Sequence, residues 1–152
     1  MGFKDRFADA IEKQQQGEEQ ALVYRLGDTL CLIPFKDIED VVTPENVRKV
    51  PGASDFFKGF FIYEKKPIVL IDTIRKIGIK EHECPMAIIY NSEEKSSPAL
   101  SISNILQAIP YNESYIHPIS SENEYPLPIQ YIEKVFNINQ NIIFQLNLSS
   151  LI

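Results

Sequence analysis

The stretch that decides the fold reads Ala21-Leu22-Val23-Tyr24-Arg25-Leu26-Gly27-Asp28-Thr29-Leu30-Cys31-Leu32-Ile33. Two short apolar runs flank Gly27-Asp28, and a two-residue break of this kind is typical of a β-hairpin turn. Similar runs follow at Gly59–Tyr63 and Pro67–Asp72, with charged residues between them. Short strands at regular spacing predict a mainly β protein built from small closed barrels.

The second half of the chain resembles the first. Ala21–Tyr24 matches Ala87–Tyr90 in its apolar positions. Likewise, Phe61–Asp72 has the same length and the same apolar ending as Phe136–Asn147. A single repeat is too short to bury its own core well, so we expect two units packed together.

These repeats predict the domain organisation. We expect an N-terminal helix and linker over residues 1–20, a first barrel repeat over roughly 21–80 and a second over roughly 86–152. The spacing of Phe3, Phe7 and Ile11 places one apolar stripe along the N-terminal helix. This helix is either a flap that covers the body of the protein or a helix that binds a partner.

Charge and hydropathy exclude several classes. The chain has 152 residues with 15 basic and 21 acidic side chains, a net charge of −6. Nucleic-acid binders usually carry a basic face, so we expect no nucleic-acid partner. No apolar run approaches the ~20 residues that span a bilayer, and the first residues contain no apolar signal region. We therefore expect a cytoplasmic protein without membrane insertion.

The sequence contains no recognisable catalytic constellation. Cys31 and Cys84 lack the spacing of metal ligands, and His82 and His117 are isolated. The glycines are scattered, so no phosphate-binding loop is present. We expect a protein that is not an enzyme, holds no cofactor or metal, and acts through its surfaces.

Several short blocks, taken in order, resemble the CheW family over nearly all of residues 21–152. They are Leu22–Gly27, Ile33-Pro34-x₃-Ile38-x-Asp40-Val41-Val42, Val50-Pro51-Gly52, Gly59 and Pro67–Asp72. The resemblance implies two five-stranded SH3-like β-barrels side by side. It also implies an adaptor that joins the cytoplasmic tip of a chemoreceptor to the regulatory domain of a CheA-like histidine kinase. The N-terminal extension is similar to that of PilI-like variants, which serve type IV pilus (twitching) systems.

The resemblance also implies partner-binding residues, which are Ile38, Asp40, Val41, Gly59 and Glu64. We expect Ile38 and Val41 in an exposed crevice between the barrels. The family usually has Asn-Leu-Arg-Gly where this chain has Ile62–Lys65, so Glu64 stands in place of an arginine. If Glu64 and Asp40 are close, they repel.

Three hypotheses remain open. The first is an adaptor with a receptor surface and a kinase surface, and the second is a diverged scaffold that keeps the fold but binds one cytoplasmic partner. A third, an oligonucleotide-binding small barrel, is favoured by the fold type and opposed by the acidic charge.

Overall fold

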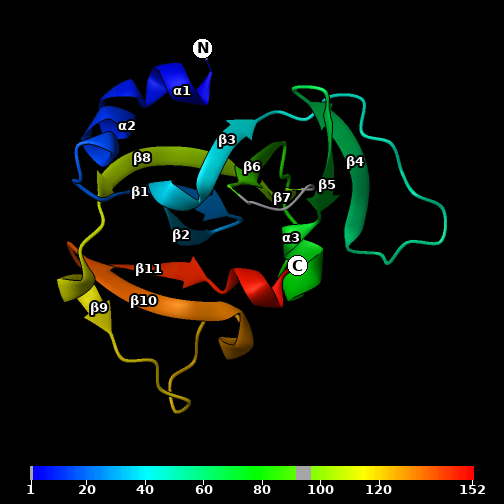
Figure 1. The fold of residues 1–152 in the computed structure, drawn as a ribbon. Coiled ribbons are helices and arrows are strands. Elements are labelled where there is room, and N and C mark those ends of the chain that lie inside the picture. The colour runs from blue at the N-terminus through cyan, green and yellow to red at the C-terminus, as the bar shows by residue number, and fades with distance from the viewer. Residues whose placement is uncertain (1, 92–96) are drawn as a thin grey trace.

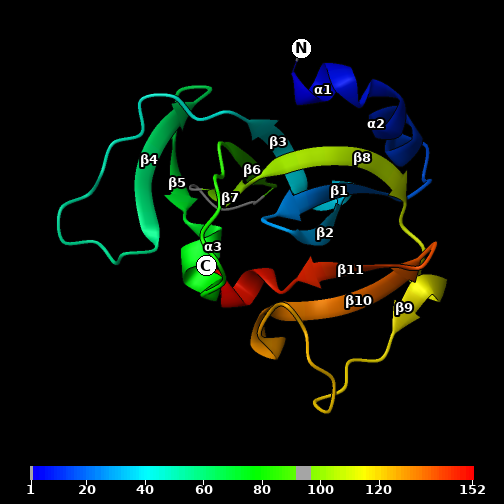
Figure 2. The same cartoon turned by 180° about the vertical axis from the view of Figure 1, so that it is seen from behind.

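The computed structural model describes residues 2–91 and 97–152. It contains two β-sheets, short helices and long connections (Figures 1 and 2). One sheet has six strands in the order β8-β1-β2-β11-β10-β9, and the other has five in the order β3-β6-β7-β5-β4. The predicted mainly β class is confirmed, with one difference in strand number, because the short β9 adds a sixth strand to the first sheet.

The strands are β1 (Gln20–Leu26), β2 (Thr29–Pro34), β3 (Ile38–Val42), β4 (Phe57–Tyr63), β5 (Lys66–Ile71), β6 (Met86–Tyr90), β7 (Pro98–Ile102), β8 (Asn104–Pro110), β9 (Ile116–His117), β10 (Ile132–Ile138) and β11 (Asn141–Leu146). The α-helices are α1 (Phe3–Arg6), α2 (Ala8–Gln15) and α3 (Thr73–Ile77). Single 3₁₀ turns are η1 (Phe35–Asp37), η2 (Glu113–Tyr115), η3 (Ile129–Tyr131) and η4 (Leu148–Ser150).

Each sheet takes strands from both halves of the chain. The β1–β2 hairpin of the first half joins β8 to β11 of the second, and the β6–β7 hairpin of the second half joins β3 to β5 of the first. The structure thus differs from the division into a barrel over 21–80 and a barrel over 86–152. The reason is that β2 pairs in parallel with β11, and β5 with β7. Parallel partners need a long crossover connection, which the rest of the chain supplies.

Both sheets nevertheless follow one plan. Replacing β1, β2, β8, β11 and β10 by β6, β7, β3, β5 and β4 converts the order of the first sheet into that of the second. Even the irregularities correspond, because β10 has a register shift between Ile132 and Lys134, and β4 has one between Phe57 and Gly59. This correspondence fits the repeat read from the sequence.

Three apolar clusters hold the fold together. One fills the five-stranded barrel around Phe61 and Ile68, and another fills the six-stranded barrel around Phe136 and Ile143. The third and largest lies between the sheets and includes Leu22. Strand β1 is buried on both faces at most of its positions. This explains why it reads as a continuous apolar run rather than an alternating one.

The N-terminal segment covers the end of the shared core. Helices α1 and α2 are separated by a break at Phe7. The rings of Phe3 and Phe7 lie 5.8 and 6.4 Å from that of Phe35, between centroids. The Arg6 Nη2 group donates a hydrogen bond to the carbonyl of Leu106 on β8 at 3.2 Å. The segment therefore has the position expected of a flap.

Candidate functional site

A hydrogen bond closes the seam of the five-stranded barrel. Strands β3 and β4 are the two edges of this sheet. The Tyr63 hydroxyl on β4 donates to Oδ2 of Asp40 on β3 at 2.6 Å, and Oδ1 of Asp40 accepts from the Val41 N–H at 2.8 Å. The predicted site residue Asp40 therefore joins the two edges.

The electrostatics of this seam keep Tyr63 protonated. Burial raises the pKa of Tyr63, and the hydrogen bond to Asp40 and the negative charges of Asp40, Glu64 and Glu39 raise it further. A phenol next to carboxylates is a hydrogen-bond donor that relieves their repulsion. Asp40 thus has a neutral donor as its partner, and the charges of Asp40 and Glu64 both act on the Tyr63 phenol.

Glu64 lies at the tip of the β4–β5 hairpin. The register Tyr63↔Lys66 leaves Glu64 and Lys65 as a two-residue turn, with φ of 47° and 67°. Positive φ at both central positions is the signature of a type I′ turn. Both side chains are exposed. The reversed charge that the sequence indicates is therefore presented to solvent, where a partner can contact it.

Gly59 has a backbone role. Its φ is 136°, it is buried, and an added Cβ would overlap the backbone carbonyl of Arg48. Arg48 and Phe60 exchange two backbone hydrogen bonds of 2.9 Å, and this close approach requires the missing side chain. Gly59 thus shapes the barrel edge and presents no side chain to a partner.

Val41 and Ile38 are less accessible than the sequence predicts. Val41 is only 4% exposed and belongs to the shared core, while Ile38 is half-buried and packs against that core. Helix α1 lies over this region, and α1 and β3 line a cavity of about 470 Å³. The open crevice that we expected is therefore partly covered by helix α1 in the structure.

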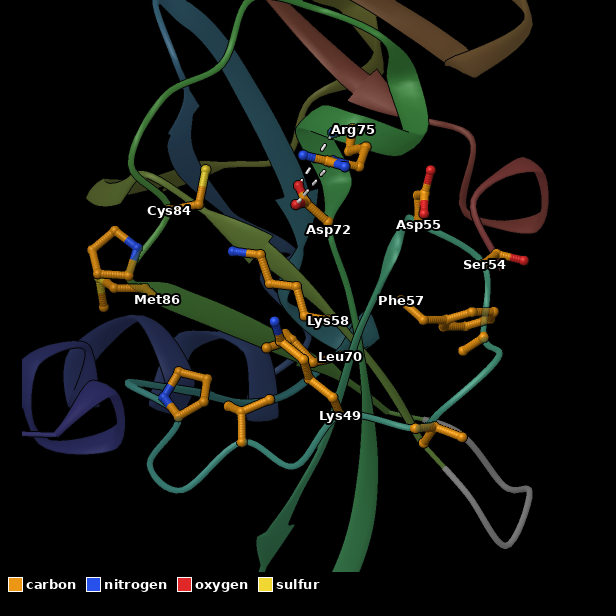
Figure 3. Close-up of a pocket in the computed structure, with 15 residues that line it drawn as sticks. Lys49, Ser54, Asp55, Phe57, Lys58, Leu70, Asp72, Arg75, Cys84 and Met86 are labelled. Carbon is orange, nitrogen blue, oxygen red and sulfur yellow. Dashed lines mark hydrogen bonds and ion pairs between the residues drawn. The ribbon is translucent and has the colours of Figure 1, made fainter.

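A larger cavity of about 710 Å³ lies at one end of the five-stranded barrel (Figure 3). Lys49 and Lys58 point into it, and Arg75 lies against Asp72, with Nε and Oδ2 4.0 Å apart. Asp72 also caps α3, because its Oδ1 accepts from the Arg75 N–H at 3.2 Å. This carboxylate therefore already has a structural role in the helix and the ion pair.

The two thiols are not activated. Burial raises the pKa of Cys31 to about 12 and also raises that of Cys84, which lines the cavity of Figure 3. A thiol that remains protonated at neutral pH is a poor nucleophile and a poor metal ligand. Within residues 2–91 and 97–152, no group of three or more His, Cys, Asp or Glu side chains could hold a metal ion. In the same ranges, no helix is both long and apolar enough to cross a membrane.

Sequence reasoning missed Tyr63 and the exposed outer face of β4–β5. Tyr63 and Asp40 are 23 positions apart, and only the barrel closure brings them together. The outer face gives a weak sequence signal, because β4 is apolar at nearly every position. The one useful clue in the sequence is that Ile62 stands where the CheW resemblance places an asparagine, and in the structure this side chain is 64% exposed.

The fold is that of a duplicated small-barrel protein, in which each half of the chain contributes strands to both barrels. A family model for the CheW-like domain matches residues 20–152, and the chain belongs to this family. The fold is similar to that of the scaffolding protein TtCheW from Thermoanaerobacter tengcongensis. The two chains are 20% identical, the match covers 86% of this chain and 85% of that chain, and the TM-score is 0.76. A search of curated proteins found no match.

Proposed function

We propose that this protein is a non-enzymatic adaptor that couples a chemoreceptor, or an equivalent receptor, to the regulatory domain of a CheA-like histidine kinase. The observation that carries the proposal is the family match, which spans both barrels. An adaptor needs two surfaces that partners can occupy at once. Two barrels with differently exposed edges meet this need.

We assign the receptor-facing surface to the seam around Asp40, Tyr63 and Glu64, with Ile38 at its margin. These residues come from β3 and the β4–β5 hairpin, and Glu64 is exposed at the turn. Its acidic charge favours a receptor tip that is more basic than usual, because unlike charges across an interface select the partner. Gly59 and Val41 support this surface from below.

The diverged single-partner scaffold is the second candidate. The turn Ile62–Lys65 favours it, because here the chain lacks the arginine that the family usually has. Glu is an acceptor and Arg a donor, so one cannot replace the other in a hydrogen bond. A scaffold of this kind would bind the kinase domain and ignore a receptor tip.

The proposal is tested by isothermal titration calorimetry with the regulatory domain of the cognate CheA-like kinase and the full-length protein. We expect saturable heat with one binding site per chain. Glu64→Arg should leave this titration unchanged and alter binding of a receptor-tip fragment. An absence of heat at concentrations of about 0.1 mM would contradict kinase coupling, since this corresponds to a Kd weaker than signalling assemblies need.

A role in a chemosensory pathway of the cytoplasm follows from the same proposal. Assignment to twitching motility rests on the N-terminal extension, whose α1 and α2 helices pack over the shared core. Removing residues 2–16 and assaying pilus-dependent and flagellar movement would separate the two outputs. Loss of twitching alone supports the pilus assignment, and loss of flagellar chemotaxis alone contradicts it.

A further inference from the structure

The last hairpin of each half can be aligned residue by residue. In β10–β11 the cross-strand pairs are Val135↔Phe144 and Asn137↔Ile142, and in β4–β5 they are Phe60↔Val69 and Ile62↔Pro67. The segment beside each hairpin also corresponds, because His117 pairs with Val135 next to β10, and Arg48 pairs with Phe60 next to β4. Directly paired residues share one face of a sheet. The outer face of one hairpin thus has a defined equivalent on the other.

The chain itself covers the part of the outer face of β10–β11 around Val135 and Phe144, whereas Ile142 nearer the turn is 44% exposed. Val135 and Phe144 are 4% and 3% exposed, and they belong to the same buried cluster as Leu127. The Tyr125 ring meets that of Phe144 edge-on, with centroids 5.9 Å apart. Tyr125 and Leu127 come from the long connection between β9 and β10, which loops past this hairpin in Figures 1 and 2. The cover is an extended segment with an aromatic anchor and a leucine.

The equivalent face of β4–β5 is more open. Ile62 is 64% exposed, Val69 is 36% exposed and Phe60 is only half-buried. The connection between β3 and β4 pairs with β4 at Arg48 and lines a cavity of about 620 Å³ with Phe60 and Ile62. Beyond Arg48 it extends outward past β4 in Figures 1 and 2. Apolar side chains grouped on one open sheet face are typical of an interaction surface.

The charges around this face indicate what covers it. Arg48 stands where His117 stands on the other hairpin, and it forms no ion pair with the described residues. At the turn, Lys65 and Lys66 add two exposed cations beside the exposed Glu64, so basic side chains outnumber acidic ones there. On the covered side, the segment that folds back carries Glu122 and Glu124 just before Tyr125. An acidic segment with apolar anchors therefore complements the open face in both charge and hydrophobicity.

We propose that the outer face of β4–β5, formed by Arg48, Phe60, Ile62, Pro67 and Val69, docks an extended segment of a partner protein. That segment carries carboxylates followed by an aromatic residue and a leucine, the chemistry of residues 122–127 of this chain. The docked segment takes the place that the Tyr125–Leu127 cover takes on β10–β11. This surface lies on the outer face of the hairpin and adds to the seam assigned to the receptor.

The probe is a labelled synthetic peptide of residues 118–128, Pro-Ile-Ser-Ser-Glu-Asn-Glu-Tyr-Pro-Leu-Pro, titrated with the full-length protein and followed by fluorescence anisotropy. We expect saturable binding with a Kd below about 1 mM, a range that allows for the cost of ordering a free peptide. Replacing the peptide's tyrosine and leucine by serine should abolish binding.

Two protein variants locate the peptide. Ile62→Asn installs the residue that the covered hairpin has at this position, and it should weaken binding roughly tenfold because one buried aliphatic anchor is lost. Arg48→Glu should weaken binding as well and reduce or reverse its dependence on salt, because the introduced carboxylate repels the acidic peptide. The matched control is Ile142→Asn, the same substitution on the β10–β11 hairpin, and it should leave the Kd unchanged.

Three results would overturn the inference. The first is the absence of saturable binding up to about 2 mM protein, which exceeds the expected Kd. The second is equal loss of binding with Ile62→Asn and Ile142→Asn. The third is a concentration-dependent dimer of the protein that Ile62→Asn abolishes, because the occupant would then be a second copy. None of these results involves the kinase or the receptor, so the proposed adaptor function is tested separately.

Discussion

The two barrels share one strand plan but close in different ways. In the six-stranded barrel, Lys134 Nζ contacts the Tyr111 hydroxyl at 3.2 Å and Glu113 at 3.3 Å, and the Tyr111 hydroxyl donates to Gln145 at 2.9 Å. In the five-stranded barrel, the seam between β3 and β4 has the single Tyr63–Asp40 side-chain bond. The six-stranded barrel is thus closed by several side chains, whereas the five-stranded barrel is closed at this seam by one bond and keeps the hairpin face at Ile62 accessible.

Two barrels built on one plan thus bury different amounts of apolar surface. The barrel with the covered hairpin gains stability from burial, and the barrel with the open hairpin keeps an apolar face exposed. Burial of one large aliphatic side chain stabilises by about 1.5–3 kcal/mol. The open face of β4–β5 therefore lacks stabilisation that the same residues would provide if the chain covered them.

The strongest test of the comparison removes the cover. Leu127 is 1% exposed, so Leu127→Ala should lower the free energy of unfolding by about 2–5 kcal/mol through the lost contacts and the cavity left behind. On the open hairpin, Ile62→Ala should change it by less than about 0.5 kcal/mol, because exposed side chains contribute little. Urea denaturation of both variants measures the difference. Equal effects would contradict the contrast between a covered and an open face.

A second test concerns the one position where the open barrel needs glycine. Gly59→Ala forces a Cβ to within 2.7 Å of the Arg48 carbonyl carbon at a φ of 136°, and we expect destabilisation of about 2–3 kcal/mol. The equivalent position on β10 is Lys134, on the same side of the register shift. Lys134→Ala should cost about 1 kcal/mol or less, since its ion pair is partly exposed. Thermal melts in which Lys134→Ala lowers the melting temperature more than Gly59→Ala does would refute the assigned role of Gly59.

A third test breaks the seam itself. Tyr63→Phe removes the hydrogen bond to Asp40 and should cost about 1 kcal/mol, the net value of an ordinary hydrogen bond, because partial exposure of the site weakens the contribution of the charge. The pH dependence has a defined sign. Because the pKa of Tyr63 is raised in the folded state, the unfolded chain releases this proton first, and stability falls as the pH rises above about 10.

The Tyr63→Phe variant should therefore lose stability less steeply than the parent protein in alkaline solution. Burial also raises the pKa of Tyr24 and Tyr90, so part of the alkaline loss remains in the variant. Urea titrations between pH 8 and pH 11 compare the two slopes, a window around the ordinary tyrosine pKa of about 10. Identical slopes would show that Tyr63 titrates as it does in the unfolded chain.

The smallest effect on stability is expected at the turn. Glu64→Arg places a cation beside Lys65 in exposed surroundings, and the free energy of unfolding should change by less than about 0.5 kcal/mol. Glu64→Arg should instead change partner binding. It should strengthen binding to a conventional chemoreceptor tip and weaken binding to the native receptor tip. The charge-neutral control is Glu64→Gln. If neither variant changes receptor binding, the turn has no role in partner choice.

The sequence predicted the elements of the fold well. The hairpin around Gly27-Asp28 and the likeness of Phe61–Asp72 to Phe136–Asn147 both correspond to strand pairs in the structure. Local patterns suffice here because turn residues and apolar runs decide a hairpin. The exchange of strands between the halves was not predicted. It depends on the parallel pairs β2–β11 and β5–β7, and apolar runs that match in both halves do not specify which half is the partner.

The candidate site was predicted less completely. Asp40 lies at the seam and Glu64 is exposed at the adjoining turn, and their role toward a partner stays a prediction. Val41 is in the core and Gly59 supports the barrel edge. Burial could not be read from the sequence, because α1 covers β3 only in the folded chain. Tyr63 escaped notice for a similar reason, since its partner Asp40 is contributed by another strand.

Sedimentation velocity shows whether this chain binds two partners at once, as we propose for an adaptor. The full-length protein is mixed with the regulatory domain of the CheA-like kinase and a receptor-tip fragment, singly and together. We predict that each binary mixture forms a complex and that the three components form a larger species with one copy of this chain per kinase domain. If the receptor fragment displaces the kinase domain, or if only one of them binds, the protein is not an adaptor.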